Sequence, residues 1–241
     1  MALLAISDHP ECLKLAGTGT LMAIGGEHYI LTARHVRDEV LAGSDHVGIT
    51  LKPDVTHRHA IPSSDFTLVG LPRPCEWNEW GPDMVLLRIP AERVGAIEAY
   101  RSFWNPIRRV EVNAEVIEVL VLMGTPAELG TIADAHADLQ INGMYLGPEK
   151  LQQVGGFDYL DYEIEQWLGI PRSFGGVSGG GVWRVWLLCP PESDQIEWKM
   201  CFHGVAFYQL NIGSNPTTIR CHGPESIKAM LGAVGPVPAG S

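Results

Sequence analysis

Residues 174–181 read Phe-Gly-Gly-Val-Ser-Gly-Gly-Gly, so glycine and serine fill six of the eight positions. An apolar run follows at 182–188 and predicts a strand. Glycine loses much conformational freedom on folding, so such a cluster is costly unless the backbone must approach another group closely. A serine in this setting is exposed as a nucleophile, and the N–H groups of Gly176 and Ser178 would converge on a developing oxyanion. The alternative interpretation is a flexible glycine loop with an incidental serine.

Two other stretches carry the residue types that activate a serine. Residues 30–36 end an apolar strand and place His35 in the turn that follows, and residues 83–89 place Asp83 at the start of a strongly apolar strand. A neutral histidine takes a proton near pH 7, and an aspartate fixes its tautomer and stabilises the imidazolium. The gaps are 48 residues (35 to 83) and 95 residues (83 to 178). Singly, each residue has an ordinary explanation, as a core histidine, a residue before a strand and a loop residue.

Together, the three stretches resemble the trypsin-like (chymotrypsin-fold) serine peptidases, over roughly residues 12–232. That family carries Leu-Thr-Ala-Ala-His, Asp-Ile-Ala-Leu-Leu and Gly-Asp-Ser-Gly-Gly blocks in the same order at similar spacing. The resemblance implies an all-β fold of two antiparallel six-stranded β-barrels with a short C-terminal helix. It also implies a serine endopeptidase that works through an acyl-enzyme, with His35, Asp83 and Ser178 as catalytic residues. The oxyanion hole would be formed by Gly176 and Ser178, and no metal or other cofactor is expected.

The same resemblance predicts the domain organisation. Residues 1–95 would form the first barrel, with His35 and Asp83, and residues 96–107 a linker. Residues 108–231 would form the second barrel, with Ser178, and residues 232–241 a flexible tail. Independently, the 27 glycines and 17 prolines make the chain rich in turns, which favours many short strands over long helices.

Three positions depart from the family pattern. Val177 stands where zymogen-derived members carry an aspartate, so activation by a freed N-terminus is not expected, and the resemblance moves toward bacterial and viral members. Phe207 stands where many members have a serine that touches the triad aspartate, which puts that contact in doubt. Gly181 replaces the commonest residue there, proline. None of these changes removes a reacting atom.

Substrate binding is predicted from the strand at 204–209, which resembles the family's pocket wall and contributes Phe207, Tyr208 and Gln209. Arg172 lies six residues before the nucleophile, and Arg220 lies on the strand expected behind the same pocket. A guanidinium at the pocket floor would select an acidic side chain through charge-assisted pairing. In the alternative interpretation Arg172 turns outward to solvent, or the preceding loop shifts the register by one residue.

Local patterns predict further elements. The strand at 157–165 alternates apolar and acidic residues, which indicates one buried face and one acidic, solvated face. The pair His57 and His59 has no carboxylate or cysteine at a telling spacing, so a solvated loop is favoured over a metal site. The remaining expected elements are a hairpin at 13–32, helices at 33–42, 91–97 and 224–231, and strands at 46–52, 65–71, 108–112, 116–123, 137–145 and 218–221.

The composition limits which binding partners and which cellular compartment are expected. The formal net charge of −11 argues against nucleic acid and anionic membranes as partners, because both require a basic surface. The resemblance to serine peptidases implies a protein or peptide substrate. The five cysteines are odd in number, Val36 occupies the place of a cysteine common in secreted members, and the first fifteen residues lack a signal-peptide pattern. These features predict reduced thiols and a cytoplasmic protein, whose activity a regulatory protein partner could restrain.

Two other functions remain open at this point. A catalytically silent chymotrypsin-fold protein would serve as a binding module, although its expected signature is loss of a triad residue. An esterase-type acyl hydrolase would use the same catalytic residues, and the sequence does not separate it from a peptidase.

Overall fold

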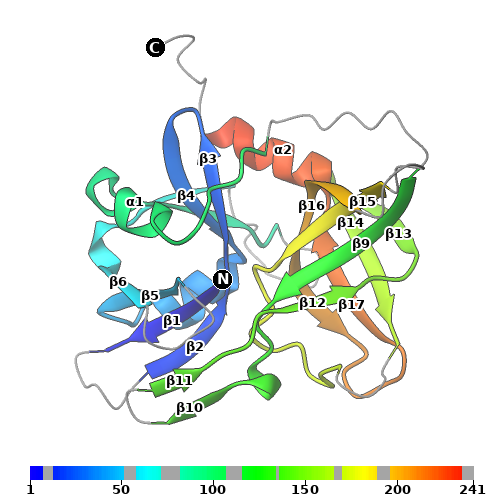
Figure 1. The fold of residues 1–241 in the computed structure, drawn as a ribbon, viewed down its shortest axis with the longest axis horizontal. Helices are drawn as coiled ribbons and strands as arrows, with labels where there is room; N and C mark the ends of the chain where they lie inside the picture. The colour runs from blue at the N-terminus through cyan, green and yellow to red at the C-terminus, as the bar shows by residue number, and fades with distance from the viewer. Residues whose placement is uncertain are drawn as a thin grey trace.

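The computed structural model describes residues 1–7, 13–51, 58–71, 82–106, 116–133, 136–165, 170–188 and 196–234. Over these residues the chain is mostly β-structure, and its strands pair antiparallel (Figure 1). Two α-helices accompany the strands, α1 (Ala91–Glu98) and α2 (Pro224–Ala233), the latter with Pro224 in its first turn, where the missing N–H costs nothing. None of the described helices is long and apolar enough to cross a membrane.

The first part of the chain builds two four-stranded sheets. The chain passes from one sheet to the other at Gly19, where an added Cβ would lie 2.6 Å from Ile30 Cγ2, so the close approach of two strands requires glycine there. One sheet has the order β2 (Leu13–Thr18), β1 (Ala2–Ile6), β5 (His46–Thr50), β6 (Arg58–Pro62). The other has the order β3 (Thr20–Ile24), β4 (Glu27–Thr32), β8 (Val85–Arg88), β7 (Thr67–Gly70).

The second part builds one seven-stranded sheet and a two-stranded ribbon. In Figure 1 the seven-stranded sheet, green to orange, lies beside the blue and cyan strands of the first part. Its order is β12 (Asn142–Tyr145), β9 (Val116–Gly124), β15 (Gly181–Leu188), β16 (Glu197–Leu210), β17 (Thr217–His222), β14 (Phe157–Ile164), β13 (Glu149–Val154). The ribbon pairs β10 (Thr131–Ala133) with β11 (His136–Asp138).

The hydrophobic core joins the two parts. Tyr159 and Phe207, from the seven-stranded sheet, pack in one cluster with Val36 and other buried side chains of the first part. Val205 and Met230 pack with Met84 and its neighbours in a second cluster. Because apolar burial is the main favourable contribution to folding, these shared clusters hold the two parts against each other.

The structure confirms the all-β prediction in its general form. The ladders among the described residues form separate sheets and do not close into a ring, so the two six-stranded barrels stay a prediction. The domain division also stays a prediction; α1 runs across its boundary between 95 and 96. The strand predicted at 137–145 is two strands, β11 and β12, and the one predicted at 108–112 lies outside the described residues.

The segment predicted as a helix at 33–42 contains a π-helical turn over Val36–Leu41, directly after His35. Short 3₁₀ turns occur at Ser63–Asp65 and Ala127–Leu129. Cys201 and Cys221 are free thiols, and burial raises the pKa of Cys221 well above its ordinary value. Cys12, Cys75 and Cys189 lie outside the described residues.

The prediction of a solvated acidic face on 157–165 holds at Glu163 and Glu165, which are exposed, and is wrong at Asp158 and Asp161. Asp158 and Asp161 of β14 are 4% and 6% exposed. The Asp158 carboxylate accepts the backbone N–H groups of Glu225 and Ser226 at the start of α2, at 3.0 and 2.6 Å. Asp158 and Asp161 are three residues apart and therefore lie on opposite faces of β14. Because β14 lies inside the sheet under α2, both carboxylates are buried, and each has specific partners.

Candidate active site

His35 and Asp83 form a partly buried hydrogen-bonded pair. Asp83 lies two residues before the start of β8 and is fully buried. Its Oδ1 accepts the backbone N–H of His35 at 2.8 Å, and its Oδ2 lies 2.5 Å from His35 Nδ1. Because an ionised carboxylate only accepts hydrogen bonds, Nδ1 carries the proton in this pair and the lone pair resides on Nε2. That tautomer is the one a general base requires.

His222, at the end of β17, supports the aspartate from behind. Its Nε2 accepts the backbone N–H of Asp83 at 2.9 Å, and its ring stacks on Phe207 with centroids 4.3 Å apart. Burial lowers the pKa of His222 to about 4, so the ring is neutral near pH 7. Its Nδ1 is buried and finds no hydrogen-bond partner in the described part of the chain.

His222 was not among the residues predicted from the sequence. The serine contact to the aspartate that is common in the family was in doubt there, because Phe207 occupies the serine's place. In the structure Phe207 contributes a ring face, and a histidine 139 residues from Asp83 provides the hydrogen bond. A single histidine one residue beyond a predicted strand carries no local signal of this role.

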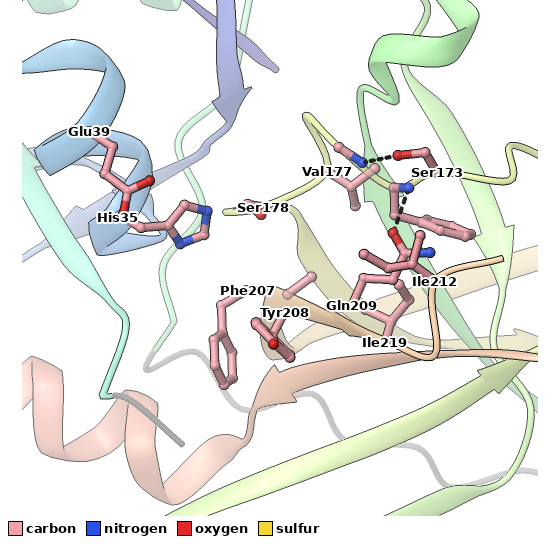
Figure 2. Close-up of a pocket in the computed structure, with 13 residues that line it drawn as sticks. His35, Glu39, Ser173, Val177, Ser178, Phe207, Tyr208, Gln209, Ile212 and Ile219 are labelled. Carbon is pink, nitrogen blue, oxygen red and sulfur yellow. Dashed lines mark hydrogen bonds between the residues drawn. The ribbon is translucent and has the colours of Figure 1, made fainter. Parts of the chain in front are cut away.

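Ser178 lies in a tight turn that faces His35. The turn closes with hydrogen bonds from Val177 N to Phe174 O and from Gly180 N to Val177 O, at 2.9 and 2.7 Å. It leads straight into β15, as the apolar run at 182–188 predicted. Figure 2 shows the His35 ring directed toward Ser178, and both side chains line one cavity of about 380 Å³.

Thr18, the last residue of β2, holds this turn from the other part of the chain. Its backbone N–H donates to Ser178 O at 2.8 Å, and its hydroxyl donates to Gly176 O at 2.7 Å. The same hydroxyl accepts the N–H of Thr125 at 3.0 Å, and the Thr18 carbonyl accepts the hydroxyl of Thr32 at 2.7 Å. Thr18 therefore joins the serine turn to the strand that leads to His35.

Each predicted oxyanion donor belongs to a peptide group whose carbonyl is held by a hydrogen bond. Gly175 O accepts Ala127 N–H at 2.8 Å, and Val177 O accepts Gly180 N–H at 2.7 Å. In a trans peptide the N–H points away from its carbonyl, so these bonds set the direction of the N–H groups of Gly176 and Ser178. Among the described residues nothing accepts from either N–H. Within the described part of the chain, both N–H groups are therefore available to an external oxygen.

Glycine is required at two positions in this turn. Gly176 and Gly179 have φ of 87° and 86°, which favour glycine. An added Cβ at Gly176 would lie 2.6 Å from Thr125 O, and one at Gly179 would collide with Thr18 O and Thr32 Oγ1. The glycine cluster seen in the sequence thus lets the backbone of this turn lie close to Thr125, Thr18 and Thr32.

The predicted substrate-binding residues divide into two groups. Phe207, Tyr208 and Gln209 line the cavity beside Ser178. Arg172 and Arg220 do not belong to its lining, so their predicted place at a pocket floor is wrong. Arg172 is exposed in the loop before the turn.

Strand alternation explains the error at Arg220. Its neighbour Ile219 faces the cavity, so Arg220 points to the opposite face of β17. There the guanidinium pairs with Asp161 through two hydrogen bonds of 2.8 Å, and the two side chains are 5% and 8% exposed. This bidentate pair is internal to the sheet.

The described residues contain no group of three or more histidine, cysteine, aspartate or glutamate side chains arranged to hold a metal ion. His57, one half of the histidine pair considered above, lies outside them.

Comparison with known proteins yields a likeness of fold. No protein-family model matches this chain, and no curated protein matches it in sequence. A solved structure from work on the coupled folding and binding of the intrinsically disordered Sesbania mosaic virus VPg protein is similar, with a TM-score of 0.51 and 12% sequence identity. The match covers 98% of this chain and 91% of that one. At this identity the likeness concerns the fold over nearly the whole chain, and carries no function.

Proposed function

We propose that the chain is a serine endopeptidase of the trypsin-like (chymotrypsin-fold) type, related to bacterial and viral members that lack the zymogen aspartate, with the two-barrel architecture of that family. The observation that supports the proposal is that His35, hydrogen-bonded to Asp83, lines the same cavity as Ser178, while the N–H groups of Gly176 and Ser178 have no acceptor among the described residues. The likeness to a solved viral structure concerns only the fold in this proposal and not the activity.

The reaction uses this chain's own groups. His35 Nε2 takes the proton of Ser178 Oγ as that oxygen attacks the carbonyl carbon of the substrate. The N–H groups of Gly176 and Ser178 hydrogen-bond the oxyanion of the tetrahedral intermediate, and Asp83 stabilises the imidazolium. His35 then gives the proton to the leaving amine, and an acyl-enzyme forms. Water, deprotonated by His35, attacks the acyl-enzyme and releases the acid, which restores Ser178.

A covalent probe tests the proposal. A fluorophosphonate that reacts with activated serines is expected to label the protein at Ser178, and Ser178→Ala should abolish labelling. Peptide hydrolysis should fall on the order of 10⁶-fold in Ser178→Ala and about 10⁴-fold in Asp83→Asn, which keeps the geometry but leaves the wrong tautomer. Ser173→Ala, a serine of the same cavity that is not in the triad, is the matched control and should remain labelled.

The outcomes separate the alternatives. Labelling at Ser178 together with hydrolysis of esters but of no peptide would assign an acyl hydrolase. Absence of labelling in folded protein would refute the proposal and leave a silent chymotrypsin-fold binding module.

A further inference from the structure

The part of the cavity beyond Ser178, away from His35, is lined mainly by apolar side chains. One wall is the turn that carries Ser178, and the other is formed by β16, β17 and the loop between them (Figure 2). The apolar groups are Phe174, Val177, Ala206, Ile212 and Ile219. A substrate side chain next to the bond attacked by Ser178 would enter this space.

Gln209 connects the two walls of this space. Its Oε1 accepts the N–H of Phe174 at 2.9 Å. Its Nε2 donates to the Arg172 carbonyl at 3.3 Å and to Thr217 Oγ1 at 3.1 Å. Both amide hydrogens and the carbonyl are thus engaged, from the loop on one side and from β17 on the other. A long substrate side chain would have to displace the amide and leave the Phe174 N–H without its acceptor, which is unfavourable.

The distribution of charge around the cavity also disfavours some substrate side chains. The acidic and basic side chains in its described lining are those of His35 and Glu39, and Figure 2 shows both on the far side of Ser178 from Gln209. The guanidinium of Arg220 is engaged by Asp161, and that of Arg172 lies outside the lining. A charged substrate side chain entering beside Gln209 would lose its hydration without gaining a partner of opposite charge.

We infer that this space is the pocket for the residue preceding the cleaved bond, that it selects a small uncharged side chain of the size of alanine or valine, and that Gln209 sets this limit. The inference rests on the proposed function. It replaces the acidic preference expected from Arg172 and Arg220. Ile219 limits the depth of the pocket from β17, and Gln209 limits its length.

A positional peptide library, varied at the residue before the cleaved bond, tests the inference. The parent protein is expected to show a kcat/KM for alanine or valine at least about tenfold above that for phenylalanine, lysine or glutamate. Gln209→Ala should raise the ratio of kcat/KM for leucine and phenylalanine over alanine by about tenfold. Gln140→Ala, the same change at an exposed position outside the cavity, should leave the ratio unchanged.

A second variant covers the case in which Gln209→Ala fails to fold. Gln209→Glu keeps an oxygen acceptor for Phe174 and adds a carboxylate, so it should raise kcat/KM for lysine relative to alanine. A parent preference for phenylalanine, lysine or glutamate overturns the inference, as does an unchanged ratio in the folded variants. Labelling of Ser178 with no library member cleaved also overturns it. Absence of labelling at Ser178, by contrast, refutes the proposed function itself.

Discussion

The Asp158 carboxylate is the cap of α2, and its replacement by asparagine tests how much this contact contributes. Oδ1 accepts the backbone N–H and the hydroxyl of Ser226, both at 2.6 Å, and Oδ2 accepts the N–H of Glu225 at 3.0 Å. Asparagine has one oxygen, so its NH₂ must face one of these donors. One bond is lost, and the others lose their charge assistance.

The expected cost of Asp158→Asn is about 3 kcal/mol. Hydrogen bonds to a charged group contribute about 1.5–3 kcal/mol and those between neutral groups about 0.5–1.5 kcal/mol, and a buried donor left unpaired adds about 1–3 kcal/mol. The contributions are not additive, so 3 kcal/mol is a central value. For a chain of this size it corresponds to a fall in Tm of about 6–12 °C.

The effect of Asp158 depends on pH in a defined direction. Burial alone would raise the pKa of this carboxyl, but hydrogen bonds from Ser226 and Glu225 outweigh it and hold the pKa below its ordinary 3.8. A lowered pKa in the folded state stabilises the fold above the unfolded value and is lost as pH falls through the folded value. The stability gap between parent and Asp158→Asn should therefore be full at pH 5–7 and narrow below about pH 4.

Urea unfolding of parent and variant between pH 7 and pH 3 measures this gap. Glu225→Gln, a neutralised carboxylate in the same first turn but exposed, is the control and should cost about 0.3–1 kcal/mol through the helix dipole. A gap at pH 7 no larger than that of the control, or one that does not shrink in acid, would refute the capping account.

Two further substitutions test the support of the site. His222→Phe removes the acceptor of the Asp83 N–H and should lower the unfolding free energy by about 2 kcal/mol, whereas His222→Gln restores an acceptor and should recover most of it. The neutral form of His222 stabilises the fold fully above its ordinary pKa of 6.5, and this contribution is lost as pH falls toward its folded-state pKa of about 4. His222→Gln should therefore reduce the change of unfolding free energy with pH between those two values. An equally steep pH dependence in the variant contradicts this. Gly179→Ala should prevent stable folding, because φ is 86° and the new Cβ meets the Thr18 carbonyl. Gly156→Ala, with φ of 84° and open space, should cost only about 1–2 kcal/mol, so similar Tm values for both variants would refute the steric argument.

The sequence predicted features whose causes are local. The turn around Ser178 could be inferred because glycines and a following apolar run lie together in the chain. His35 and Asp83 could be inferred because each adjoins an apolar strand, β4 or β8, that positions it. These two strands pair in the structure, with Thr32 opposite Val85, so neighbouring strand ends bring the two side chains together.

The sequence did not predict features whose partners are distant in the chain. Asp161 pairs with Arg220, 59 residues away, and Asp158 caps a helix 68 residues away, so these two aspartates were misinterpreted as part of a solvated face. Arg220 was placed in a pocket because the face of β17 depends on register, and a shift of one residue exchanges Ile219 for Arg220.

The hydrogen bonds of Thr18 and His222 join parts of the site that are synthesised at different times. During synthesis His35 and Asp83 emerge first, the Ser178 turn follows, and His222 comes 44 residues after Ser178. At about 5–20 residues per second, roughly 2–9 seconds separate the synthesis of Ser178 from that of His222, which holds the backbone of Asp83. Until β17 has joined the sheet and the serine turn has met Thr18, the reacting groups are present but not aligned. Under the proposed function, a chain in which these contacts have not yet formed is inert toward its neighbours, and cleavage begins only after they form.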